Sequence, residues 1–202
     1  MRTMTRAALA ILVLLGPGGP VFAADPSDPD WPCIQRKVPH LSIGVMWPHP
    51  LPEETAPLPP DLDDVAAQLA LRRVSEEQAQ ALIDEVGAQH PDFGLEDYGR
   101  LFQSTFERID RQRSDIVAGI GRYARNQSQL ATEVDQLEAE MSQLESAEAA
   151  NFDRMDEVEA ELDWRIRIFN DRSKALTYVC ESPVLLEQRA YAIAQMLLKA
   201  AG

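Results

Sequence analysis

Apolar residues recur at intervals of seven along residues 95–144, and this repeat restricts the possible folds more than any other feature of the sequence. Its members are Leu95, Phe102, Ile109, Ile116, Tyr123, Leu130, Leu137 and Leu144. A companion row four positions further on includes Phe106, Ile120, Val134 and Met141. Two apolar rows with this spacing are typical of the contact face of a coiled-coil helix. The segment is therefore predicted to form one long helix with a helical partner.

A second repeat follows over residues 152–180. Met155, Leu162, Phe169 and Leu176 are spaced by seven, and their companion row includes Phe152, Ile166 and Cys180. Polar residues interrupt both companion rows: Arg113 and Gln127 in the first repeat, Glu159 and Ser173 in the second. Polar residues in a contact face lower stability but can set the register of the two helices.

Two architectures fit these repeats, because no glycine or proline lies between Gly121 and Pro183. One is a single helix over about residues 95–181, with a stutter at the eleven-residue step between the repeats. The other is a hairpin that turns near residues 145–151. We favour the hairpin, since a single chain of this size gains a core by folding its two apolar faces onto each other.

The hairpin predicts a definite register. The pairs expected to face each other are Leu144 with Phe152, Leu137 with Glu159, Leu130 with Ile166, Ile120 with Leu176 and Ile116 with Cys180. The same register brings two segments, "GIGRYARNQ" and "YVCESPVLLEQR", to the same level of the hairpin.

Three shorter helices are predicted around the hairpin. Residues 61–74 place Leu62, Val65 and Leu69 on one helical face, and Ser75 with Gln78 forms a capping box that begins a helix over 76–89. Ser182 and Pro183 are an N-cap and a first-turn proline, so they predict a separate C-terminal helix over 183–200. The expected fold is an all-α domain over residues 61–202, with hairpin arms at 95–146 and 150–181.

The residues before this domain divide into a leader and an arm. Residues 1–23 resemble a cleavable signal peptide, since Arg2 and Arg6 precede nine apolar residues and Val21-Phe22-Ala23 suits cleavage. We therefore expect a periplasmic or secreted protein that is soluble after cleavage, not an integral membrane protein. Residues 24–60 carry ten of the 14 prolines, which favour an extended Pro-rich arm over a helix.

The chain has two cysteines, Cys33 in "DWPC" and Cys180 in "YVCESP". An even number in an exported chain predicts a disulfide between them. The alternative of a redox or metal-ligating thiol lacks a Cys-x-x-Cys motif and any histidine within five residues. This cysteine pair around a coiled coil resembles a group of uncharacterised exported bacterial proteins, and that resemblance implies no activity.

Charge is strongly unbalanced. Without residues 1–23 the chain has 17 Lys and Arg against 33 Asp and Glu, a net charge of −16, which disfavours nucleic acid and anionic lipid as partners. Residues 132–163 carry a net charge of −11, whereas residues 100–125 together with 164–174 carry +6. The hairpin is therefore expected to have an acidic tip and a basic root. Both are interpreted first as solvated faces of the helices, and the tip also as a dock for a basic protein or cations.

No catalytic pattern is present in the sequence. Ser104, Ser114 and Ser128 have no nearby histidine in sequence, and His40, His49 and His90 are too scattered for a metal site. We therefore predict neither enzymatic activity, nor a cofactor, nor a metal site. The residues expected to bind a partner are Arg122, Tyr123, Arg125, Tyr178 and Glu181.

These observations predict a non-catalytic scaffold or adaptor that binds another periplasmic protein, a basic one if charge selects the partner, through its helical hairpin. The alternative is a cation-binding or chaperone-like protein that acts through the acidic tip. The sequence leaves a dimer open.

Overall fold

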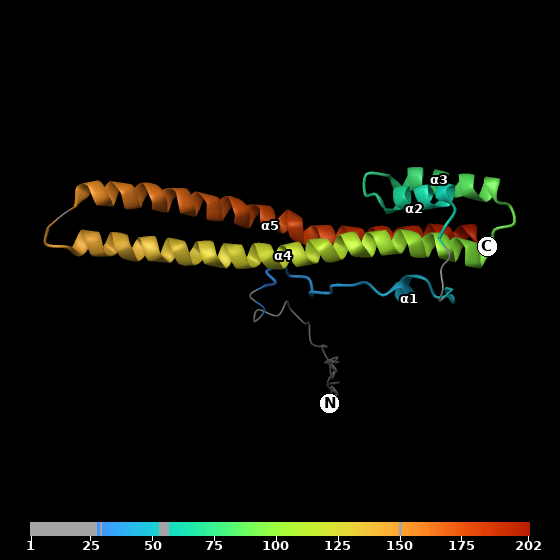
Figure 1. Cartoon of the computed structure of the whole chain (residues 1–202), viewed down its shortest axis with the longest axis horizontal. Helices are drawn as coiled ribbons and strands as arrows, with labels where there is room; N and C mark the ends of the chain where they lie inside the picture. The colour runs from blue at the N-terminus through green and yellow to red at the C-terminus, as the bar shows by residue number, and fades with distance from the viewer. Residues whose placement is uncertain (1–27, 29, 53–56, 150) are drawn as a thin grey trace, which may run out of the picture.

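The computed structural model describes residue 28 and residues 30–52, 57–149 and 151–202 (Figure 1). Within these ranges the backbone forms helices and no strand, so the predicted all-α fold is confirmed. The helices are α1 (Ile43–Met46), α2 (Pro60–Ala70), α3 (Glu76–Gln89), α4 (Leu95–Ser146) and α5 (Phe152–Ala200). The predicted signal peptide lies outside the described residues. In the described ranges every helix is too short or too polar to cross a membrane.

The two long helices, α4 and α5, lie side by side and run in opposite directions (Figure 1). This arrangement confirms the helical hairpin and contradicts the continuous rod. Asn151 begins α5 as its N-cap, and its side-chain oxygen accepts a hydrogen bond from the backbone N of Arg154 at 3.2 Å. An asparagine at this position satisfies a helix-end donor, so the turn is encoded locally.

The register of the hairpin follows the repeats. A pairing of Ile120 with Leu176 implies that Gln127 lies opposite Phe169. Gln127 Nε2 donates to the carbonyl oxygen of Phe169 at 2.8 Å and to Ser173 Oγ at 2.9 Å. Two polar residues that interrupt the apolar rows thus bond across the helix pair, and any shift of register would break both bonds.

The expected pairing is wrong near the tip. Phe152 is 71% exposed and Glu159 is exposed as well, whereas Val158 is fully buried. Val158 lies three residues after Met155, and Glu159 lies four residues after it. Both spacings return to nearly the same helical face, and burying a valine is favourable where burying an unpaired carboxylate is costly.

The predicted separate C-terminal helix is also wrong, because α5 continues through Pro183 to Ala200. Pro183 lacks a backbone N–H, so the carbonyl of Val179 loses its usual partner. Beyond the proline, an apolar stripe keeps α5 on the core, with Leu186, Ala190, Ile193 and Leu197 all buried. This burial favours a continuous helix over the break that Ser182 and Pro183 predict from sequence.

The main core lies at the root of the hairpin, where α2 and α3 pack against the first half of α4 and the second half of α5. Its fully buried side chains include Trp47, Leu69, Ile83, Leu101, Phe102, Ile109, Leu186, Ile193 and Leu197. The predicted capping box of α3 is present, with Ser75 Oγ accepting from the N of Gln78. Helix α2 ends at Ala70 instead of residue 74, because residues 71–74 form the turn that precedes this cap.

Away from the root the hairpin is thin. We define residues 126–176 as the distal hairpin. Of its described residues only Leu130 and Val158 are buried. The two helices there cover each other, and no other described segment covers their outer faces (Figure 1).

The Pro-rich arm runs along the root, and in Figure 1 it lies on the opposite side of the α4–α5 pair from α2 and α3. It is extended apart from the short helix α1, which the sequence did not predict. Trp47 stacks on Phe102 of α4 with ring centroids 5.3 Å apart. The arm therefore contributes to the core and is not a free tail.

Candidate protein-binding surface

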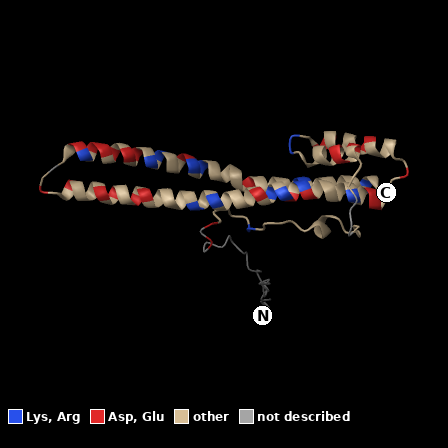
Figure 2. Ribbon diagram, viewed as in Figure 1, with Lys and Arg blue, Asp and Glu red and all other residues tan. Residues whose placement is uncertain are grey.

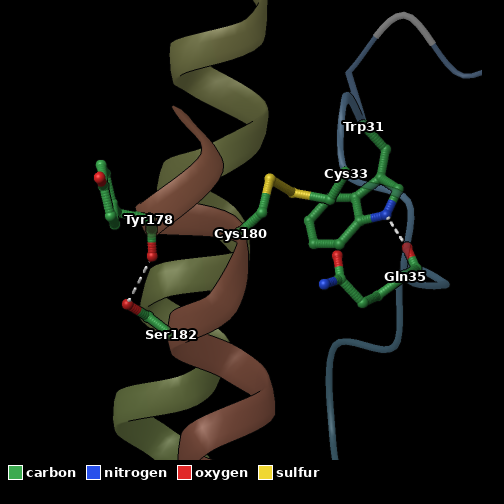
Figure 3. The surroundings of a disulfide bond; sticks show 6 residues. All are labelled: Trp31, Cys33, Gln35, Tyr178, Cys180 and Ser182. Atoms are coloured by element: carbon green, nitrogen blue, oxygen red, sulfur yellow. Dashed lines mark hydrogen bonds between the residues drawn. A yellow bond between two sulfur atoms is a disulfide. The ribbon is translucent and has the colours of Figure 1, made fainter. Parts of the chain in front are cut away.

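A disulfide joins the arm to the hairpin, as predicted. Cys33 and Cys180 are bonded, with Cα atoms 5.5 Å apart (Figure 3). Trp31 and Ile120 are buried in the same small cluster as Cys33. Figure 3 shows Tyr178 on the side of α5 that faces away from the arm. The disulfide thus anchors one side of α5 and leaves the other side open.

Arg113 forms a second anchor for the arm. Its side chain is only 6% exposed although it is charged. Its Nε donates to the carbonyl oxygen of Pro183 at 3.2 Å, and Nη1 donates to the carbonyl oxygen of Val38. Nη2 lies 3.7 Å from a carboxylate oxygen of Glu187. One buried guanidinium therefore connects the arm, α4 and α5.

A third anchor brings together a serine, a histidine and an aspartate, which sequence reasoning missed. Asp110 Oδ1 accepts from the N of Leu41 at 2.7 Å, and Oδ2 lies 2.8 Å from His40 Nδ1. Ser114 Oγ donates to the carbonyl oxygen of Pro39 at 2.7 Å and lies 3.0 Å from the same Nδ1. A catalytic triad requires the serine and the aspartate on different ring nitrogens. These contacts hold the arm and do not form a proton relay.

Two of the predicted partner-binding residues, Tyr123 and Arg125, form contacts within the molecule. Arg125 Nη1 lies 2.6 Å from Asp30 Oδ2 of the arm, and Tyr123 Oη donates to the carbonyl oxygen of Arg172 at 2.6 Å. Burial raises the pKa of Tyr123, and the nearby charge of Arg172 partly offsets that rise. Both side chains therefore have structural contacts that a partner would have to break.

The other three predicted residues, Arg122, Tyr178 and Glu181, are exposed. Tyr178 is 74% exposed, and Figure 3 shows its ring extending away from the helix axis. The predicted set is thus divided between contacts inside the molecule and side chains free to meet a partner.

A feature that sequence reasoning missed is Trp164, which is 60% exposed. The other two tryptophans, Trp31 and Trp47, are buried. Trp164 and Tyr178 are fourteen residues apart, which is two heptads, so they lie on the same side of α5. We define the outer face of α5 as Trp164, Ile168, Ala175 and Tyr178. The sequence contains a signal for this exposure, because each aromatic residue follows an inward-facing leucine by two positions and therefore points outward.

The tip of the hairpin is acidic, as Figure 2 shows. Some of its carboxylates are paired with arginines across the two helices. Arg154 of α5 lies 2.6 Å from Glu140 of α4, and Arg165 of α5 contacts Glu133 of α4. Within α5, Arg154 also lies 3.0 Å from Glu157. The hydrogen bonds that Arg154 donates to Glu140 and Glu157 raise the pKa of Arg154. Within the described residues no group of three or more His, Cys, Asp or Glu side chains is placed to hold a metal ion.

No protein-family model, curated protein or solved structure matches this chain. The class of this protein is therefore described from its own fold and contacts. It is an all-α protein in which an antiparallel helical hairpin is cross-linked to an N-terminal arm and exposes aromatic side chains on one outer face.

Proposed function

We propose that the chain is a non-catalytic scaffold or adaptor protein of the periplasm or the extracellular space, and that it binds another protein through the outer face of α5. One observation carries the proposal: Trp164 and Tyr178 are exposed on the same side of one helix. Tryptophan and tyrosine are the residue types most enriched at the energetic centres of protein interfaces. Leaving two of them in water on a rigid helix costs stability that partner binding would recover.

The rest of the fold suits presentation of this face. The root provides a packed core, and Cys33–Cys180 cross-links the arm to α5 only two residues from Tyr178. From residue 116, which lies at the level of Cys180, to residue 146, α4 extends roughly 45 Å beyond the disulfide at 1.5 Å per residue. A helical surface held in this way is already in its binding conformation, so little entropy is lost on association.

Charge favours a partner with basic residues beside its contact surface. Residues 132–163, which include the part of α5 just before Trp164, carry a net charge of −11. Such a field accelerates encounter with a basic surface and disfavours acidic ones. The location outside the cytoplasm is supported by the disulfide, a bond that persists in oxidising compartments, and by the predicted signal peptide.

The proposal is tested by cross-linking capture in cells that export the protein, followed by mass spectrometry. The wild-type chain should recover one dominant partner. Trp164→Ala and Tyr178→Ala should each weaken purified-partner binding roughly thirtyfold, the loss expected for an interface centre of about 2 kcal/mol.

Phe152→Ala is the matched control, because Phe152 is equally exposed on the same helix but lies outside the outer face of α5. It should leave the affinity unchanged. Equal losses in all three variants, or capture of many unrelated unfolded proteins, would contradict the adaptor proposal. Sedimentation of the purified chain decides whether it is a monomer or the dimer that the sequence leaves open.

A further inference from the structure

The charge along α5 changes sign at Trp164, in the middle of the distal hairpin. Residues 152–163 carry six Asp and Glu against one Arg, a net charge of −5. Residues 165–178 carry four Lys and Arg against one Asp, a net charge of +3 (Figure 2). The stretch of α5 that exposes Trp164 and Tyr178 therefore begins beside an acidic segment and is itself basic.

Four of these charged side chains form one row along an edge of the outer face of α5. They are Asp156, Asp163, Arg167 and Lys174, and all four are exposed. Their spacings of seven, four and seven residues each return to nearly the same side of a helix. The row therefore reads acid, acid, base, base along the direction of the chain.

The charges of this row are not used within the molecule, apart from one weak contact. Asp156, Asp163 and Arg167 have no ion-pair partner among the described residues. Lys174 lies 3.9 Å from Asp171, and both side chains are exposed, so that pair contributes little. The row is thus available to a partner with the complementary pattern.

A second copy of α5 has that complementary pattern in one orientation. If two α5 helices lie antiparallel with a two-fold axis level with residue 165, residues equally distant from 165 lie at the same level. Asp156 is then level with Lys174 of the second copy, and Asp163 is level with Arg167. A parallel pair would instead place each residue beside its own copy, acid against acid and base against base, which is unfavourable.

The dimensions of the hairpin permit this overlap. Helix α5 begins at Phe152, thirteen residues before the axis, and Tyr178 lies thirteen residues after it. The shared length is about 40 Å at 1.5 Å per residue. Residues beyond Tyr178 in one copy lie past the tip of the other, so the two packed roots do not collide. The arm does not interfere either, because Tyr178 lies on the side of α5 that faces away from it (Figure 3).

We propose that a second copy of the chain covers the outer face of α5 in the free protein, as an antiparallel dimer with the two Trp164 side chains on either side of the two-fold axis. Burial of Trp164 and Ile168 supplies the attraction. Four ion pairs between the copies, two on each side of the axis, set the orientation. The inference rests on the proposed function, since it concerns the same face, and it adds that an adaptor's partner must displace the second copy.

Sedimentation equilibrium of the purified full chain tests the dimer, in a concentration series up to roughly 1 mM that detects dissociation constants in the millimolar range or below. The wild-type mass should approach twice that of one chain. One variant combines Asp156→Lys with Asp163→Lys, and the other combines Arg167→Glu with Lys174→Glu. Each alone should dimerise roughly a hundredfold more weakly, because four attractive pairs become repulsive. An equimolar mixture of the two variants should regain the wild-type affinity, since its four pairs are again of opposite charge.

The matched control combines Asp135→Lys with Glu138→Lys, which changes the net charge by the same amount at exposed positions of α4. It should leave the dimer intact. The inference is overturned if the wild type remains a monomer throughout the series, or if the mixture dimerises no better than each variant alone. A monomer that still captures one dominant partner would overturn this inference and leave the proposed function standing. A dimer restored by mixing, without any captured partner, would support the inference and contradict the adaptor role.

Discussion

At the scale of single residues, two polar side chains in the apolar rows bind the segments of the molecule together. Gln127 bonds across the hairpin to Phe169 and Ser173, and Arg113 bonds to both the arm and α5. The sequence predicts that such residues set the register. It does not predict the arm carbonyl of Val38 as an acceptor for Arg113, because the path of an extended arm has no periodic signature.

Replacing Arg113 with methionine should lower the free energy of unfolding by roughly 2 to 3 kcal/mol, because the buried carbonyl of Pro183 and the partly buried carbonyl of Val38 lose a charged donor. Urea denaturation followed by circular dichroism measures the change. Arg111→Met is the control, since Arg111 is exposed two residues away, and its effect should be small. Equal losses for the two variants would show that Arg113 is not an anchor.

The choice between Val158 and Glu159 shows a limit of residue-level prediction. The repeats give the inward face of α5 to within one residue, because positions three and four residues after Met155 lie on neighbouring parts of the helix surface. Only the packing against α4 decides between them, and it buries the valine.

At the scale of elements, α5 continues through two residues that predict the start of a new helix. Ser182 and Pro183 are good helix starters, yet the helix runs through them. Ser182 Oγ donates to the carbonyl oxygen of Tyr178 at 3.4 Å, and Arg113 donates to that of Pro183. Local propensity could not predict this outcome, since it depends on contacts with α4 that are distant in sequence. The bounds of α4, 95–146, were predicted because its heptads are a local signal.

Pro183→Ala distinguishes a continuous helix from a new helix that starts at the proline. Inside a helix, alanine is favoured over proline by about 3 kcal/mol, while losing the buried ring costs roughly 1 to 2 kcal/mol. The free energy of unfolding should therefore rise by about 1 to 2 kcal/mol. Val184→Ala, which only removes partly buried methyl groups, should lower it. A loss of stability in Pro183→Ala would indicate a helix boundary at this point.

The disulfide belongs to the arm as an element. Removing it with Cys33→Ala and Cys180→Ala should lower the free energy of unfolding by about 2 to 5 kcal/mol, because the unfolded chain regains the conformational entropy that the cross-link removes. Fluorescence of the buried Trp31 should also report loosening of the arm before the helices unfold. A single, unchanged transition in the double variant would contradict the role of the arm as an anchored strap.

At the scale of the whole molecule, the chain divides into a packed root and a thin distal hairpin. The charge blocks predict the acidic tip from sequence (Figure 2). The heptad repeats, which continue along both arms, do not predict that most buried side chains lie at the root. The candidate binding surface was predicted only in part. Tyr178 is exposed as expected, but Tyr123 and Arg125 are bound internally. Trp164 was overlooked, although its place two residues after an inward-facing leucine marks it as an outward position.

The central structural claim is that the chain folds back on itself, since the outer face of α5, the disulfide and the root all depend on it. It is tested most directly by a spin-label distance between the exposed positions Ser128 and Asn170, introduced as cysteines, labelled and diluted with unlabelled protein. The hairpin predicts helix axes about 10 Å apart, as expected for packed helices, so the label distance should exceed this only by the length of the two label side chains. A distance of about 60 Å, the length of 42 residues of continuous helix, would contradict the account.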